Sequence, residues 1–194
     1  MARPIELSNV TQIYLEEYQR ILKKMMQGMT YVTITCSISE NFIKQIIPYQ
    51  IAAIQMSENV LRFTTNIPVQ NLALEIIRTH TEMLESLESL QNRCCVVQNS
   101  EYELYEYMCA YKEITEAMFN AMCAPPVSNS ININYLREMI VHHQGGIRLA
   151  QNVLRFCICQ ELIPILKCMI QTLCEQLEAM EKLLDSLQNC DCEC

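Results

Sequence analysis

The chain has 194 residues, of which 51% are hydrophobic and 19% are charged, and its formal net charge is -8. This balance is typical of a globular protein that can bury one sizeable core or two small ones, and it excludes a disordered chain. The negative charge repels the phosphate groups of nucleic acids and anionic lipids, and the sequence has no local basic patch to compensate. We therefore expect neither nucleic acid nor a membrane surface as a partner.

The segment "MARPIELSNV" lacks the apolar core of a secretory signal, and no window of the sequence reaches the roughly 20 apolar residues of a membrane span. We therefore expect synthesis in the cytoplasm without a signal peptide, and no membrane span. Twelve cysteines are unusual in such a protein, because a reducing cytosol does not sustain stable disulfides. Metal binding, redox chemistry, or oxidation after lysis of the producing cell would each explain them.

Composition and periodicity favour helix nearly throughout. The chain has three glycines and no tryptophan, and apolar residues recur at helical spacing over residues 7–29, 38–63 and 69–90. Ser37 gives a cap signature before the second of these helices, and Asn66 gives one before the third. The expected fold class is all-α.

The sequence also contains an internal repeat with an offset of about 93 residues. The string "NVLRF" at 59–63 recurs at 152–156, and "NFIKQIIPYQIAAIQMSENVLRF" aligns with "NYLREMIVHHQGGIRLAQNVLRF" around it. We therefore expect two tandem three-helix repeats, residues 1–95 and 96–194, which form one antiparallel bundle or two.

The repeat also predicts a difference between its two copies. "LESLQN" in the first copy matches "LDSLQN" in the second only after a shift of four more residues. The last helix of the second copy is therefore expected to be about one turn longer than its counterpart.

The string "EMIVHHQGGIRLAQ", followed by a helix that ends "LEAMEKLL", resembles the bacterial ferritin-like family called domain of unknown function 305. The hallmark of that family is Met-Ile-x-His-His. The resemblance covers the second and third helices of each copy, but only the second copy has the histidine pair, His142 and His143, where the first has Tyr49 and Gln50. It implies ferritin-like packing and, in some members, a link to copper, but no known reaction.

The spacing of side chains around the histidine pair indicates one possible metal site. Glu138 and His142 share one face of the expected helix, while Met139 and His143 share the next. A thioether with an imidazole suits a soft ion, so a copper or zinc site is one hypothesis. The alternative is that the pair is hydrogen-bonded structure within a packed helix. His80 is expected to lie alone at the surface.

Enzymatic activity is not expected. A ferritin-type di-iron site needs Glu-x-x-His motifs, which are missing from the sequence, and Gln45 stands opposite Glu138 in the repeat. Nucleophilic catalysis lacks a base placed by sequence near any cysteine.

The repeat shows what kind of position each cysteine occupies. Seven cysteines lie opposite polar residues of the other copy, so we expect them at the surface: Cys36 (Asn129), Cys109 (Glu16), Cys123 (Thr30), Cys157 (Thr64), Cys159 (Asn66), Cys168 (Glu75) and Cys174 (Thr81). The other five end the two copies and are expected on mobile ends: Cys94, Cys95, Cys190, Cys192 and Cys194.

Thiols spread in this way do not converge as the ligands of one metal cluster must, and the sequence has no Cys-x-x-Cys. The Cys-x-Cys pairs could still bind soft metal as a metallothionein-like tail does. The first hypothesis is a non-enzymatic structural protein without a cofactor, which assembles with itself into an ordered array and is crosslinked by intermolecular disulfides through the twelve cysteines. It is similar in this to cysteine-rich outer-layer proteins of spores from anaerobic bacteria, which implies deposition on the spore surface.

Overall fold

The computed structural model describes residues 6–91 and 93–190, and this part of the chain is helical apart from its connecting loops. The all-α prediction is confirmed, and the three helices predicted for the first repeat end within two residues of their expected positions. The elements are α1 (Asn9–Thr30), α2 (Ile38–Leu61), α3 (Ile67–Leu90), the 3-10 turn η1 (Cys94–Val96), α4 (Glu101–Cys123), α5 (Ile131–Val153) and α6 (Leu162–Cys190).

Polar side chains fix where the helices begin. The Ser37 hydroxyl accepts a hydrogen bond from the Glu40 backbone N–H at the start of α2, and Asn66 caps α3 in the same way through the N–H of Val69. Ser100 and Glu103 form a reciprocal capping box at the start of α4. As predicted, α6 is longer than its counterpart, with 29 residues against 24 in α3.

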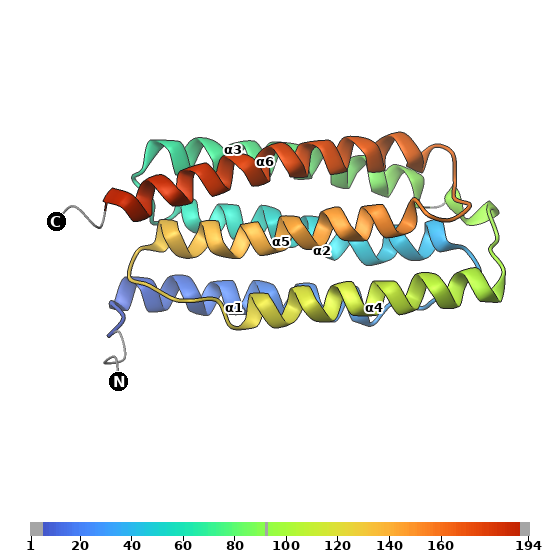
Figure 1. Ribbon diagram of the computed structural model, residues 1–194, viewed down its shortest axis with the longest axis horizontal. Coiled ribbons are helices and arrows are strands. Elements are labelled where there is room, and N and C mark those ends of the chain that lie inside the picture. Colours follow the sequence, from blue (N-terminus) through green and yellow to red (C-terminus); the bar gives the residue numbers. More distant parts are fainter. Residues whose placement is uncertain (1–5, 92, 191–194) are drawn as a thin grey trace.

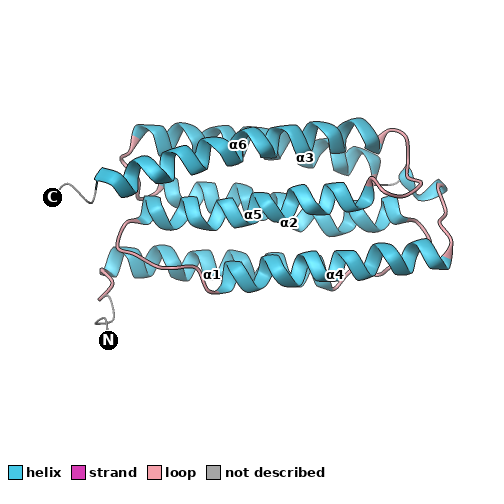
Figure 2. Cartoon of the chain, viewed as in Figure 1, coloured by secondary structure: helices cyan, strands magenta, loops and turns pink. Residues whose placement is uncertain are grey.

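The six helices form a single bundle of three layers (Figure 1). Helices α2 and α5 form the middle layer, α1 and α4 lie on one side of it, and α3 and α6 lie on the other. Most connecting loops lie at the ends of the bundle, while the α4–α5 loop runs alongside α1 towards one end (Figure 2). The middle helices bury side chains on most of their faces, as expected of elements covered on two sides. None of the helices in the described ranges has the length and apolar character that crossing a membrane requires.

The two repeats contact each other through pairs of interactions that the 93-residue offset interconverts. The Tyr18 hydroxyl donates to the backbone oxygen of Met122 at 2.8 Å, and the Tyr111 hydroxyl donates to that of Met29 at 3.0 Å. Exchanging the two repeats converts one of these hydrogen bonds into the other. The repeats are therefore related by an approximate two-fold axis through the middle of the bundle.

Tyr49 of α2 and His142 of α5 are counterparts in the repeat, so their contact lies on this axis. Their rings stack with centroids 3.8 Å apart and planes 15° apart. The Tyr49 hydroxyl donates to the backbone oxygen of His142 at 3.0 Å, and His142 Nε2 lies 3.3 Å from the backbone oxygen of Tyr49. Each residue thus contacts the opposite helix in two ways, through ring stacking and through a contact with its backbone oxygen.

Another pair of equivalent hydrogen bonds differs in its acceptor, which is a carboxyl group in the second repeat and an amide in the first. The Tyr14 hydroxyl donates to Glu138 Oε2 at 2.5 Å, while the Tyr107 hydroxyl donates to Gln45 Oε1 at 2.6 Å. Glu138 is buried, and its Oε1 has no hydrogen-bond partner. Burial raises the pKa of the Glu138 carboxyl to about 8, although the hydrogen bond from Tyr14 partly opposes this shift.

The axial contact leads to a prediction about Gly146. A methyl group there would overlap the Tyr49 hydroxyl and ring, whereas the first repeat has Ala53 at this place and the smaller His142 across the axis. Gly146→Ala should lower the free energy of unfolding by about 1–3 kcal/mol, because a ring stacked on His142 cannot move aside. Urea unfolding measures the change.

Gly145→Ala is the matched control, because the three atoms nearest its added methyl group all belong to the side chain of Met118, which is more flexible than a tyrosine ring. It should cost less than Gly146→Ala, and Tyr49→Phe should recover part of the stability lost in Gly146→Ala. Equal losses at the two glycines would contradict the axial constraint.

The Glu138 carboxyl predicts a dependence of stability on pH. Its pKa is raised from an ordinary value of 4.5 to about 8, so between these values the folded protein holds a proton that the unfolded chain has released. This contribution to stability is fully present below pH 4.5, and it is lost as the pH rises towards 8. Glu138→Gln should remove this slope and be more stable than the wild type above pH 8, as measured by urea unfolding between pH 4 and 9.

The first repeat supplies the control. Gln45→Glu should add a second slope of the same sign, because it places a carboxyl beside Tyr107 in the equivalent buried position. An unchanged pH profile in Glu138→Gln would show that this carboxyl is not the titrating group.

Candidate functional site

Three histidines gather in the core where α2, α3, α5 and α6 meet. His80 comes from α3, and His142 and His143 come from α5; all three side chains are fully buried. The ring centroids are 5.4 Å apart for His80 and His143, 5.8 Å for His142 and His143, and 6.3 Å for His80 and His142. We call these three residues the histidine cluster.

The prediction that His80 lies alone at the surface is therefore wrong. His80 belongs to a buried stripe of α3 at helical spacing, between Ile76 and Met83. Its counterpart in the repeat is Leu173, which is also buried. The repeat alignment that indicates the cysteine positions therefore also indicates a core position for His80.

Several ring nitrogens of the histidine cluster have no hydrogen-bond partner. His142 uses Nε2 for the contact with the Tyr49 carbonyl, so its Nδ1 is left unpartnered, and neither nitrogen of His80 has a partner. His143 differs, because its Nδ1 lies 3.0 Å from the Met139 carbonyl and its Nε2 lies 2.9 Å from the Gln176 side chain. Buried polar atoms without partners are rare in folded proteins, and each one requires an explanation.

Burial disfavours the protonated form of each residue in the histidine cluster. Burial lowers the pKa of His80 and His142 well below the usual value, and repulsion between the rings lowers it further. Burial also lowers the pKa of His143 to about 4, against the opposing effect of its hydrogen bonds. A neutral imidazole with one N–H donated to a carbonyl presents its lone pair at the other nitrogen, as His142 does at Nδ1.

Two buried thioethers contact the side-chain amide of Gln50, the residue that follows Tyr49. Gln50 Nε2 is 3.2 Å from Met83 Sδ and 3.8 Å from Met169 Sδ, and Gln50 Oε1 has no partner. By the repeat register, the Gln50 contact with Met83 is the counterpart of the contact between His143 and Gln176. Met83 of the first repeat thus places a soft sulfur where Gln176 of the second repeat places an amide.

The predicted ligand set differs from this arrangement in two residues. Glu138 points to Tyr14 of α1 and not to the histidines, and Met139 contacts His143 through its backbone oxygen. His80, from another helix, is the side chain that joins the pair. Periodicity within α5 alone could not identify a partner from α3.

The cysteines divide into buried and exposed groups. Cys94 of η1 and Cys159 of the α5–α6 loop are buried and form a disulfide within the chain, with Cα atoms 5.3 Å apart. The predictions that Cys159 is exposed, that Cys94 lies on a mobile end, and that both link different molecules are therefore wrong. The polar counterpart Asn66 was misleading, because it caps a helix in a half-buried loop.

Six other cysteines are free and exposed, which confirms the surface positions that the repeat predicts: Cys36, Cys109, Cys123, Cys157, Cys168 and Cys174. The side chains of Cys95 and Cys190, and all of Cys192 and Cys194, lie outside the described residues. Within the described ranges, one group of three potential metal ligands lies close together, Cys94, Cys159 and Glu161, but the disulfide occupies its two sulfurs.

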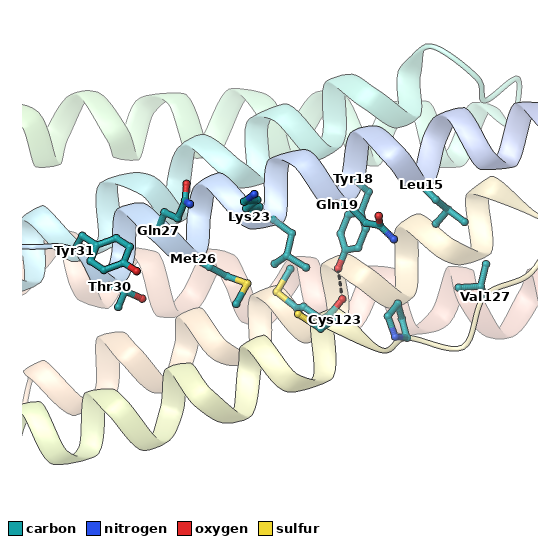
Figure 3. A pocket seen from close by; sticks show the side chains of 13 residues that line it. Leu15, Tyr18, Gln19, Lys23, Met26, Gln27, Thr30, Tyr31, Cys123 and Val127 are labelled. Carbon is teal, nitrogen blue, oxygen red and sulfur yellow. Dashed lines mark hydrogen bonds between the residues drawn. The ribbon is translucent and has the colours of Figure 1, made fainter.

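An apolar groove of about 490 Å³ runs between α1 and the chain that leaves α4 (Figure 3). Leu15, Leu22 and Met26 of α1 line one wall, and Cys123 and Val127 line the other. The groove therefore presents apolar surface beside an exposed thiol.

Comparison with known proteins is consistent with the three-layer helical fold. The crystal structure of a DUF305 fragment from Deinococcus radiodurans superposes with a TM-score of 0.55 at 20% sequence identity, and the match covers 79% of this chain and 99% of that one. No curated protein matches the sequence. The family model described as "Domain of unknown function (DUF305)" matches residues 39–184, which include α3, α4, α5 and most of α2 and α6. The chain therefore belongs to the DUF305 family.

Proposed function

We propose that this protein is a non-enzymatic structural protein that assembles with itself and is then crosslinked by intermolecular disulfides. One observation supports this most: each of the six free cysteines whose side chains are described is exposed. Free cysteines in globular proteins are usually buried and behave as small hydrophobes. Exposed thiols spread over the α1–α2 loop, α4, the α5–α6 loop and α6 are suited to joining neighbouring copies.

An exposed stripe on α4 offers a surface for reversible contact before crosslinking. Tyr102 and Tyr105 are 71% and 67% exposed, and Cys109 lies one turn further along the same face. The counterparts on α1 are the polar residues Asn9, Gln12 and Glu16. The fold therefore does not require aromatic residues at these positions, and Tyr is a residue favoured at protein interfaces.

The proposed setting is a proteinaceous layer such as a spore surface. A chain made in a reducing cytosol would keep its exposed thiols free, and release into air would let oxygen oxidise pairs of thiols in adjacent copies. Covalent links would then make an assembled layer resistant to heat and denaturant.

Crosslinking predicts a specific pattern on gels. Protein exposed to air should give a ladder without reductant and a single band with it, and negative-stain microscopy of the same samples should show ordered particles or sheets. Serine at the ten cysteines other than Cys94 and Cys159 should abolish the ladder and preserve the helical circular dichroism, because the described free thiols are exposed.

The matched control exchanges only the disulfide pair. Cys94→Ser with Cys159→Ser should keep the ladder, since these sulfurs are buried and joined within the chain. Tyr102→Ser with Tyr105→Ser should slow ladder formation while all thiols remain. A monomer in air at high concentration would refute the proposed assembly.

We propose a second candidate function, the binding of a soft metal ion by the histidine cluster. The unpartnered nitrogens of His80 and His142 favour it, because a bound ion would satisfy these buried lone pairs. His143 would become a third ligand by releasing Gln176, and the three rings would have to close in around the ion, because their nitrogens are not as close together as the ligands of one ion must be. The hydrogen bond from His142 to the Tyr49 carbonyl is the outer contact that metal-binding histidines usually make.

The surrounding donors favour copper(I) or zinc over a hard cation. The thioethers of Met83 and Met169 contact Gln50, the neighbour of Tyr49 in the chain, and the Glu138 carboxyl is hydrogen-bonded to Tyr14. Neutral nitrogen and sulfur donors without a carboxylate are typical of soft and borderline ions.

Metal analysis tests this second candidate. Protein purified without chelator and loaded with Cu(I) or Zn²⁺ should retain about one ion per chain after desalting. His80→Leu should lose this ion and still fold, because the equivalent residue of the other repeat is the buried Leu173. Glu138→Gln should keep the ion. A metal-free wild type after loading would exclude the site.

A further inference from the structure

Three loops that carry cysteines meet at one end of the bundle and are joined by Asn99. Its backbone N–H donates to the Cys36 carbonyl at 2.8 Å, and its side-chain Nδ2 donates to the Cys157 carbonyl at 2.9 Å. Its Oδ1 accepts from the Ile38 N–H at 3.0 Å. The α1–α2 loop, the linker between the repeats and the α5–α6 loop are thus held together by one residue.

The disulfide lies beneath these loops. The Ser37 hydroxyl donates to the Cys94 carbonyl at 3.2 Å, and the Cys159 N–H donates to the Ser39 hydroxyl at 2.9 Å. Both sulfur-bearing residues are buried, so a thiol in solution has little access to the bond. Cys157, in contrast, is free and exposed.

Cys157 is close to the disulfide along the chain. One residue, Ile158, stands between it and Cys159, so their Cα atoms are at most about 7 Å apart. The Cα atoms of Cys159 and Cys94 are 5.3 Å apart. One loop therefore carries both an accessible thiol and a buried sulfur that is already oxidised.

We propose that this end of the bundle is a thiol–disulfide exchange centre, in which Cys157 opens the buried Cys94–Cys159 disulfide and passes it to a thiol of a second copy. The inference rests on the proposed crosslinking function and deepens it, because it identifies a cysteine that can form an intermolecular bond without oxygen.

The exchange balances without any external oxidant. The Cys157 thiolate attacks Cys94 Sγ; a Cys157–Cys94 bond forms, the Cys94–Cys159 bond breaks, and Cys159 leaves as a thiolate that takes up a proton. A thiolate of the second copy then attacks Cys157 Sγ, and Cys94 leaves in the same way. One disulfide is consumed and one is formed, and the two protons lost by the attacking thiols end on Cys94 and Cys159.

Glu161 is positioned to stabilise the opened form. Its Oε2 lies 3.0 Å from Cys159 Sγ, and its Oε1 accepts a hydrogen bond from Arg93 at 3.0 Å. A sulfur in a disulfide has no proton to donate, but the released Cys159 thiol can donate one to this carboxylate. The hydrogen bond therefore forms only after exchange, once Cys159 has taken up its proton, and it stabilises the product in which Cys159 is a free thiol.

The test uses the full chain with its Cys94–Cys159 bond verified by peptide mapping, kept free of oxygen and mixed with one equivalent of reduced glutathione. Alkylation and mass spectrometry should find glutathione on Cys157, together with free thiols at Cys94 and Cys159. Cys157→Ser should slow this opening about tenfold or more, because a solution thiol must then reach the buried bond directly.

Cys36→Ser is the matched control, since Cys36 is also exposed and is also bonded to Asn99. It should open at the wild-type rate, and both variants should melt at the wild-type temperature. Opening of Cys157→Ser at the wild-type rate, or no opening in the folded wild type, would overturn the proposal. Dilute monomer is sufficient for this assay, so a failure of self-assembly would appear separately as a missing ladder in air.

Discussion

The contact between Tyr49 and His142 is the constraint on which the rest of the structure depends. Equivalent residues of two repeats meet face to face, and each is hydrogen-bonded to the backbone of the other. This fixes the separation of α2 and α5, and it leaves room only for glycine at position 146. The same contact occupies His142 Nε2 and leaves its Nδ1 without a partner. The interaction that joins the repeats therefore also creates one of the unpartnered nitrogens of the histidine cluster.

The arrangement of the helices is nearly symmetric, but the two middle helices carry different side-chain groups. Where α2 has the neutral residues Gln45, Tyr49 and Gln50, α5 has the titratable residues Glu138, His142 and His143. These groups diverge in the fold, because Glu138 faces Tyr14 of the outer layer while His143 faces Gln176 of α6. The carboxyl and the imidazoles are therefore separate features, and a ligand of the histidine cluster would be held mainly by neutral donors.

Local signals in the sequence were sufficient for the helices and for much of the cysteine surface. Caps at Ser37 and Asn66 act over three residues, so they can be read without knowledge of the fold. The repeat adds information that local signals lack, because a polar counterpart indicates an exposed position for six of the seven cysteines to which it applies, Cys159 being the exception. It could not predict the disulfide, since Cys94 lies in a linker and its partner Cys159 is 65 residues away. The core position of His80 follows from the apolar stripe that includes Ile76 and Met83, and a single histidine considered without that stripe does not indicate it.

The disulfide also bears on when crosslinking would occur. A bond that closes a loop of this length stabilises a folded chain by roughly 4 kcal/mol, mainly by restricting the unfolded state. Exchange would transfer that bond from within one molecule to a pair of molecules, so an isolated copy would lose stability by opening it. A copy already packed against its neighbours would recover the loss through interface contacts and the new link. Transfer of the bond to a second copy would therefore be favoured in assembled copies, whereas a dilute molecule opens the bond only when a small thiol such as glutathione takes the place of the second copy.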